Sequence, residues 1–478
     1  MEVFKNYLLL INGGLLLVVF ILLIVWSKLF NFALFIDTIR RIFYIGILLT
    51  FYRRTNIGWQ FNISSGENIP FLPYSYLNFG INEWGFWLTI ILTLLNFINI
   101  VTSYNNKHPK PSTYTALLLV IEFGAFGVLC SKEPLWFFIF FEFSILPLFI
   151  LIKLYGYESR EIAAIRYLIY TAISGVIIFF ILLLCIVNLP SEHIVSDKTY
   201  SGIEHIVRSV EKLSQANIKI FYYILVFLAF AIKIPLIGFH FWLPYAHTEA
   251  PTAGSVLLAG IILKLGLYGY YLFGGFKFVY LLPSLPVLFS ILNLIYGSLV
   301  VFYEKDLKKF IAYSSISHMG VAWTAINLMD SQKVALFYAV SHGISTGGLF
   351  ILAGFLLENN HLRDIKSYQG LIKFSPLFCL LFTIFCLISM GFPGFSGFVG
   401  EIYTIARTFY SENNTAYTIS MAIFILFNTW LNINLLSKIV WGNVTNEKLN
   451  LEGSQRVLWL SPLIILSLIL GIKPSIIL

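Results

Sequence analysis

Four ionisable side chains lie inside long apolar runs of the sequence. Glu142, Lys233, Lys264 and Glu401 each have mostly hydrophobic neighbours on both sides. A charged group at the centre of a bilayer costs at least about 2.5 kcal/mol on insertion scales, so chance does not keep several in one chain. Because carboxylates and amines can take up and release protons, these positions predict proton transfer within a membrane.

Glu142 and Lys233 are interpreted as a carboxylate and the amine whose proton affinity it sets. Glu142 lies in the run WFFIFFEFSILP, and Lys233 stands two residues before Pro235. A proline inside a helix removes a backbone hydrogen bond and frees a carbonyl four residues earlier, which can admit water beside the lysine. Two alternatives stay open: an ion pair that only packs helices, and an amine that reaches the membrane surface.

Lys264 and Glu401 are interpreted as further proton carriers. Lys264 lies in LLAGIILKLGL, twelve residues into an apolar span, and Glu401 follows GFPGFSGFVG. The alternative for Lys264 is a neutral amine bonded to a backbone carbonyl. The alternative for Glu401 is a carboxylate at the end of a helix, in contact with water.

Histidines add groups that titrate near neutral pH. His318 and His342 lie in consecutive apolar spans among serine and tyrosine residues, and together they can carry protons through water. His240 and His247 flank the turn FWLPYA, where they either link Lys233 to the next lysine or satisfy loop backbone. Taken alone, each histidine is more often a hydrogen-bonded core residue.

Three other buried charges receive less weight. Glu122 lies inside an apolar span and is expected to line water. Arg40 and Arg41 are adjacent, and adjacent residues do not share a helix face. We therefore expect these arginines near a membrane surface or a partner subunit.

Composition excludes a soluble enzyme. The 478 residues are 58% hydrophobic and only 11% charged, whereas soluble domains carry roughly a quarter charged residues. The net charge of +8 is spread through the segments between apolar runs, which indicates membrane orientation and not nucleic-acid binding. The sequence has no phosphate-binding or dinucleotide motif, and its four cysteines lie in apolar segments without ligand spacing. We expect no disulfide, metal or cofactor on this chain.

Apolar runs of about twenty residues predict an all-α polytopic membrane protein with about 14 transmembrane helices. The run at 374–410 is too long for one span and contains Pro393 between glycines, so it predicts two half-helices. The break near Pro235 lies five spans earlier. Five is an odd number, so this spacing predicts two inverted five-helix repeats. The expected spans are about 7–26, 29–51, 83–104, 113–131, 134–155, 165–188, 218–240, 252–273, 279–303, 307–328, 332–357, 374–410, 417–441 and 456–472.

The repeats divide the chain into four parts. These are N-terminal helices (1–112), a first repeat (113–273), a second repeat (274–441) and a C-terminal helix (442–478). Counting spans places the long polar stretches 52–82 and 190–217 on one face of the membrane. Lysine and arginine are modestly enriched on the other face, which we expect in the cytoplasm or mitochondrial matrix.

Four motifs resemble the antiporter-like, proton-translocating membrane subunits of NADH:ubiquinone oxidoreductase, respiratory complex I. The resemblance covers roughly residues 80–470. One detail differs from the paralogous chains 2 and 5, which usually have lysine where this sequence has Glu401. The motifs are KIPLIGFHFWLPYAHTEAPTAGS from Lys233 on to Lys264, IAYSSISHMG at 311–320, SHGISTGGLF at 341–350 and GFPGFSGFVGE at 391–401.

The resemblance implies a role for each buried charge. Glu142 would form an ion pair with Lys233, Lys264 would be the central proton carrier, and Glu401 would be the last site before release. The two histidines of consecutive spans, described above, would lie near Lys264. The fold implied is fourteen helices with two inverted repeats.

The resemblance also implies a multi-subunit setting. NADH, FMN, iron–sulfur clusters and ubiquinone would be bound by other subunits, and chains 2 and 5 with accessory subunits would be neighbours. Lipids, cardiolipin among them, are expected partners. The location would be the mitochondrial inner membrane, with a bacterial plasma membrane as the alternative. A subunit of a multi-subunit cation/proton antiporter is the alternative function, and a scaffold whose charges only pack helices is a third.

Overall fold

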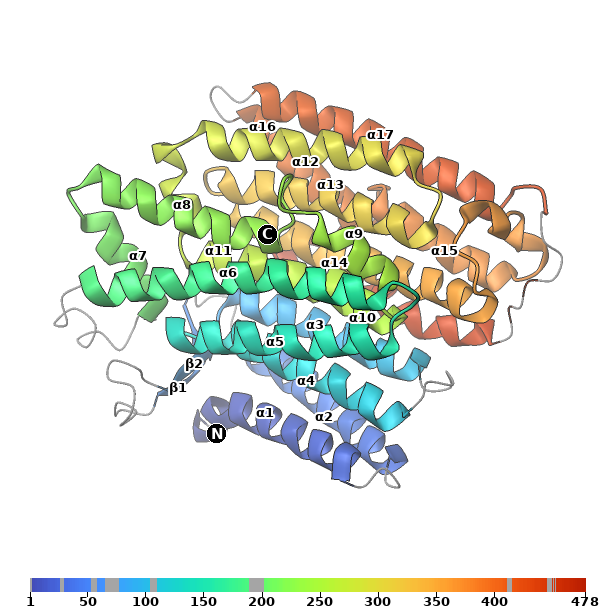
Figure 1. Cartoon of the computed structure of the whole chain (residues 1–478), viewed down its shortest axis with the longest axis horizontal. Coiled ribbons are helices and arrows are strands. Elements are labelled where there is room, and N and C mark those ends of the chain that lie inside the picture. Colours follow the sequence, from blue (N-terminus) through green and yellow to red (C-terminus); the bar gives the residue numbers. More distant parts are fainter. Residues whose placement is uncertain are drawn as a thin grey trace.

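A computed structural model describes residues 2–25, 30–52, 58–64, 77–103, 110–188, 202–410, 415–444, 449, 451 and 453–478. Figure 1 shows long helices lying side by side, with α1 and α2 at one edge and α16 and α17 at the opposite edge. Ten described helices are long and apolar enough to cross a membrane, or eleven if one bent pair is counted as a span. The predicted all-α polytopic class is confirmed.

In the N-terminal half, each expected span corresponds to one continuous helix. Proline stands at the start of α4 and of α5, where its missing N–H has no helical partner to lose. The elements are α1 (Glu2–Val25), α2 (Phe30–Phe51), β1 (Gln60–Ser64), β2 (Asn78–Ile81), α3 (Glu83–Ser103), α4 (Pro111–Cys130), α5 (Pro134–Tyr155), α6 (Arg160–Asn188), α7 (Gly202–Lys212) and α8 (Ala216–Lys233).

The C-terminal half contains shorter helical pieces as well as full spans. The two expected breaks both lie here or at its edge, between α8 and α9 and between α15 and α16. The elements are α9 (Trp242–Glu249), α10 (Thr252–Leu257), η3 (Leu258–Ile262), α11 (Leu263–Leu272), η4 (Gly275–Leu281), α12 (Ser284–Tyr303), α13 (Leu307–Asn327), α14 (Gln332–Asn360), η5 (Ile365–Tyr368), η6 (Leu371–Lys373), α15 (Pro376–Ser389), α16 (Ser396–Tyr410), α17 (Thr415–Ile439), η7 (Ser454–Leu460), α18 (Ser461–Ile472) and η8 (Pro474–Ile476).

The first break ends the seventh expected span at Lys233, earlier than the predicted 240. The carbonyl that Pro235 leaves free, that of Ala231, accepts the N–H of Leu236 at 2.9 Å. The indole of Trp242 donates to the Ile232 carbonyl at 2.9 Å. The chain therefore leaves the helix with its backbone groups bonded, as a buried break requires.

The span predicted at 252–273 contains an irregularity that hydropathy does not reveal. The segment η3 (Leu258–Ile262) is a π-helix between α10 and α11. A π-turn widens the helix by one residue and is often found at functional sites. Here it lies directly before the turn that carries Lys264.

Described parts of the polar stretches 52–82 and 190–217 contact each other, and their place on one membrane face stays a prediction. Strands β1 and β2 form an antiparallel hairpin, with Gln60 opposite Ile81. The Trp59 indole donates to Glu204 of α7 at 2.9 Å, and the Ile203 N–H donates to the Lys132 carbonyl at 3.3 Å. The hairpin and α7 were not predicted as elements, because short extramembrane pieces carry no hydropathy signal.

Candidate functional site

Lys264 lies at the centre of the bundle, completely buried. Its Nζ donates to the carbonyl of Ala259 in the π-turn and lies 2.8 Å from His342 Nδ1 of α14. Gly343 allows this approach, because a Cβ there would meet the Gly260 carbonyl at 3.0 Å. The carbonyl contact expected for a neutral lysine is therefore present, together with a titratable neighbour that a purely structural lysine does not need.

A line of ionisable and hydroxyl side chains continues from His342. Its ring lies 5.4 Å from the ring of His318 on α13, measured between centroids. His318 Nδ1 is 2.6 Å from the hydroxyl of Tyr338. Both histidines are buried. The structure therefore places the two predicted histidines side by side inside the bundle, next to Tyr338, which the sequence analysis did not identify.

Glu401 ends this line on α16, directly after the second break. Its carboxylate is buried and interacts with Tyr338 and with Asn428 of α17. Gly391 lies against the same carboxylate, since a Cβ at this residue would be 2.3 Å from Glu401 Oε2. The Oε1 atom has no hydrogen-bond partner among the described residues. The alternative of a carboxylate exposed to water at a helix end does not fit this burial.

Lys233 and Glu142 are close but not in contact. The Lys233 amine is buried and lies 4.6 Å from the centre of the Phe141 ring. The two charges interact electrostatically, yet they form none of the ion pairs within 4.0 Å found in the described residues. Glu142 instead lies against Gly175 of α6, where its Oε1 has no partner in the part of the chain described. This arrangement corresponds to an open pair.

The two lysine helices touch near their charges. A Cβ at Gly266 would lie 2.7 Å from the Lys233 Cβ, so α8 and α11 pack almost backbone to backbone. His240 packs on Tyr296, with ring centroids 5.1 Å apart, and His247 stacks on Phe350 at 4.6 Å. His240 Nδ1 and both His247 ring nitrogens lack protein partners within the described residues, so a direct link between the lysines stays a prediction.

Sequence reasoning also missed two asparagines that complete the broken helices. Asn293 of α12 accepts the Ile237 N–H at 2.8 Å and lies 3.4 Å from the Pro235 carbonyl. Asn428 of α17 donates to the Ser389 carbonyl at 2.8 Å, at the end of the half-helix before the second break. A polar residue in an apolar span was the available signal, but the sequence does not tell which break each would reach.

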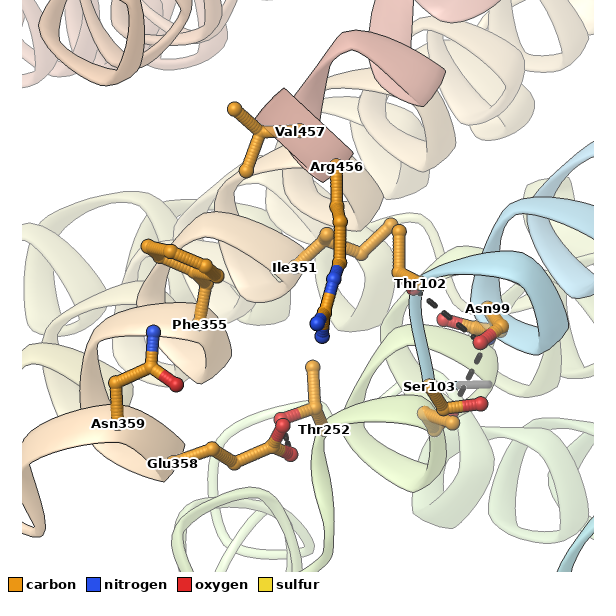
Figure 2. A pocket seen from close by; sticks show the side chains of 11 residues that line it. Asn99, Thr102, Ser103, Thr252, Ile351, Phe355, Glu358, Asn359, Arg456 and Val457 are labelled. Atoms are coloured by element: carbon orange, nitrogen blue, oxygen red, sulfur yellow. Dashed lines mark hydrogen bonds between the residues drawn. The ribbon is translucent and has the colours of Figure 1, made fainter. Parts of the chain in front are cut away.

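One end of the bundle holds a further group of charges, of which Lys308 and Glu249 are buried and the others partly buried. Lys308 donates to the Ala250 carbonyl at 2.9 Å, and Arg363 pairs with Glu249 at 2.8 Å. Beside them is a cavity of about 30 Å³, into which Arg456 points toward Glu358 in Figure 2. A polar cavity of that volume has room for about one water molecule.

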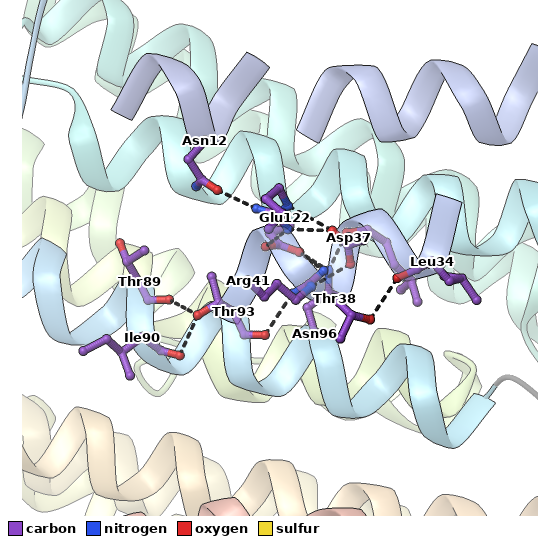
Figure 3. Close-up of polar contacts among 12 residues, drawn as sticks. Asn12, Leu34, Asp37, Thr38, Arg41, Thr89, Ile90, Thr93, Asn96 and Glu122 are labelled. Atoms are coloured by element: carbon purple, nitrogen blue, oxygen red, sulfur yellow. Dashed lines mark hydrogen bonds and ion pairs between the residues drawn. The ribbon is translucent and has the colours of Figure 1, made fainter. Parts of the chain in front are cut away.

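The expectation for Arg40, Arg41 and Glu122 was wrong. Figure 3 shows Arg41 and Glu122 gathered with Asp37 in one buried cluster between α2 and α4, and Arg40 pairs with both carboxylates of this cluster. Asp37 receives both guanidinium groups, at 2.8 Å and 2.7 Å, and Glu122 receives both at 3.0 Å and 2.5 Å. Adjacent arginines can share partners because their long side chains bend toward one point, although their Cβ atoms diverge. Glu122 also accepts from Asn96, so it is paired and does not face water.

Two broken helices and a line of buried ionisable side chains between them define an antiporter-like membrane protein. Residues 131–431 match the family described as "NADH:quinone oxidoreductase/Mrp antiporter, TM". This match covers more than half of the chain, and the chain belongs to that family.

Two curated relatives indicate to which group of the family this chain is similar. The "NADH-ubiquinone oxidoreductase chain 4" of Chondrus crispus is 34% identical over 461 residues, which cover 93% of this chain and 89% of the relative. The "NADH-quinone oxidoreductase subunit M" of Rickettsia conorii is 33% identical over 411 residues, 83% of this chain and 80% of the relative. The chain is thus a member of the chain 4/subunit M group.

A solved structure agrees with the fold. A chain of "Respiratory complex I from Thermus thermophilus with bound NADH" superposes with a TM-score of 0.81, 23% sequence identity, and coverage of 100% of this chain and 96% of that one. The complex I resemblance of the four motifs is confirmed. Where the repeats begin and end along the chain stays a prediction.

Proposed function

We propose that this chain moves protons across the membrane within a complex that reduces quinone with NADH. The observation that carries the proposal is the buried line from Lys264 through His342, His318 and Tyr338 to Glu401. Each member can bind or release a proton, and each lies next to the following one across helix boundaries. Membership of the chain 4/subunit M group supports the redox partner.

The Glu142–Lys233 pair would act as the switch for this line. When the carboxylate approaches, it stabilises the charged form of the lysine. When the pair opens, Lys233 loses its anionic partner and releases its proton toward Lys264. Quinone reduction elsewhere in the complex would drive the opening and closing, as a coupling free energy between distant sites.

The redox groups and the neighbouring subunits of the complex would lie outside this chain. We assign NADH, FMN, iron–sulfur clusters and ubiquinone to other subunits, and chains 2 and 5 to neighbouring positions in the membrane arm. The mitochondrial inner membrane is the proposed location. The alternative location is a bacterial plasma membrane. The alternative function is a subunit of a multi-subunit cation/proton antiporter, and the family description also names an antiporter.

The test replaces Lys264 with methionine in the intact complex. The purified complex in proteoliposomes should lose proton uptake and most coupled NADH:quinone activity. Lys277→Met is the control, since that lysine forms only a half-exposed pair with Glu211. Normal proton transport by an assembled Lys264→Met complex would refute the proposal.

Purification of the native complex that contains this chain distinguishes the redox-driven function from the antiporter alternative. Co-purification with flavin and iron–sulfur subunits, together with NADH oxidation, supports the redox-driven function. A complex of membrane subunits alone that moves protons only under a sodium gradient supports the antiporter.

A further inference from the structure

Three buried serines from distant helices form a hydrogen-bonded cluster beside the second break. Ser396 Oγ, at the start of α16, lies 2.9 Å from Ser341 Oγ of α14 and 2.9 Å from Ser467 Oγ of α18. The Ser396 N–H also donates to Ser467 Oγ, at 3.3 Å. Ser467 is fully buried in a helix whose other residues after Ser461 are apolar, and nothing in the proposed proton line uses it.

The C-terminal helix α18 touches the break a second time through its backbone. A Cβ at Gly471 would lie 2.2 Å from the Gly394 carbonyl oxygen and 2.7 Å from the Phe395 carbonyl carbon. Such close approach is possible only for glycine. Ser467 and Gly471 are one helical turn apart, so α18 holds the connecting segment at two points of one face.

The segment that α18 holds is the one that shapes the surroundings of Glu401. Gly391, before the break, lies against the Glu401 carboxylate, and Ser396, after it, stands five residues before Glu401 on the same helix. A displacement of either half would therefore move this carboxylate relative to Tyr338. Ser341 adds a tie to the other end of the line, because the next residue is His342, the neighbour of Lys264.

We propose that Ser467 is a positioning residue: α18 holds the second break through Ser467 and Gly471, and this contact keeps Glu401 in register with the proton line. A hydroxyl inside a membrane helix is free to bond its own backbone, yet this one bonds to Ser396 at the start of another helix, α16. The same face of α18 thus carries the polar contact and the glycine contact. The proposal rests on the proposed function, since it assigns Ser467 an effect on proton transfer through Glu401.

The experiment compares Ser467→Ala with Ser298→Ala in the purified, reconstituted complex. Ser298 is a matched control, because it is also buried in a membrane helix but, among the described residues, its hydroxyl bonds only to the Leu294 carbonyl of its own turn. Loss of a buried hydrogen bond shifts an opening equilibrium by about fivefold. We expect about fivefold faster hydrogen exchange at 391–401 in Ser467→Ala, and at least about a twofold lower ratio of protons moved to NADH oxidised.

A merely structural role would lower the amount of complex without changing that ratio. The double variant Ser396→Ala with Ser467→Ala should lose less than the sum of the two single variants, because both single variants remove the Ser396–Ser467 hydrogen bond. An unchanged ratio in Ser467→Ala would overturn the proposal, whether or not hydrogen exchange becomes faster.

Glu401→Gln separates this failure from failure of the proposed function. If Glu401→Gln abolishes pumping while Ser467→Ala behaves as Ser298→Ala does, only the positioning role is wrong. If Glu401→Gln pumps normally, the proton line itself is wrong, and the positioning role fails with it.

Discussion

The buried cluster of Asp37, Arg40, Arg41 and Glu122 allows a sharp test of how the N-terminal helices are held. Replacing Glu122 with glutamine keeps the size and shape of the side chain and removes one negative charge. The wild-type cluster has two positive and two negative groups, and its side chains are only 1–3% exposed. The variant leaves an uncompensated positive charge in a site without access to water.

The magnitude follows from the contacts of Glu122. Its carboxylate accepts from Arg40 at 3.0 Å, from Arg41 at 2.5 Å and from Asn96 at 2.5 Å. Removing one partner of a buried ion cluster costs about 3–5 kcal/mol, because the remaining charge stays desolvated. That energy corresponds to a shift of roughly two to nearly four orders of magnitude in the equilibrium between docked and undocked N-terminal helices. We expect poor assembly of the complex and a lower thermal midpoint.

The assay measures the yield of assembled complex on native gels and its melting in mild detergent. Glu211→Gln is the control, because it breaks a half-exposed ion pair with Lys277 that contributes about 0–1 kcal/mol. Combining Glu122→Gln with Arg41→Gln restores neutrality and should recover much of the loss. If Glu122→Gln assembles and melts like wild type but no longer pumps, the cluster belongs to the proton path and the structural explanation is refuted.

Three further predictions concern packing around Lys233, around Glu401 and at the first break. Gly266→Ala should push α11 away from Lys233, since the new Cβ would lie 2.7 Å from the lysine Cβ. Coupled NADH:quinone activity should then fall at least about tenfold, and wild-type rates would show that the helices can separate without loss of activity. Gly391→Ala should also lower pumping, because this residue has φ of +68° and faces Glu401, and the measurement is the ratio of protons to NADH oxidised against Gly14→Ala, where a Cβ has open space. Asn293→Leu should cost about 1–3 kcal/mol by leaving backbone groups of the first break unbonded, seen as a lower melting midpoint; an unchanged midpoint would mean that water replaces the amide.

Local sequence signals were sufficient for the class of protein and for the breaks. Hydropathy sums over some twenty residues, so it is insensitive to errors at single positions, and it placed helices at nearly every expected span. Pro235 and Pro393 interrupt helices for a reason that lies within one turn of the chain. Lys264 and Glu401 stood out because a charge is costly in any apolar span, whichever helices surround it.

The resemblance implied histidines near Lys264, but most other partners of the buried charges could not be predicted from the sequence. Which groups meet depends on how each helix is rotated and on which helices pack against it. Arg41 and Glu122 are 81 residues apart, and Ser396 and Ser467 are 71 residues apart. Adjacent residues do not share a helix face, so the sequence predicted that Arg40 and Arg41 point apart. In the structure, both side chains reach the same acceptor, Glu122 of α4.

The sequence by itself determined that this chain lies in a membrane, where its helices break and which of its side chains are ionisable at depth. These properties depend on local composition and on the backbone chemistry of proline and glycine. Tertiary structure alone decided that Arg41 meets Glu122, that Glu142 and Lys233 stand apart, and that α18 contacts the second break. Each of those contacts joins helices far apart in sequence, and only the close packing of complete helix faces selects them.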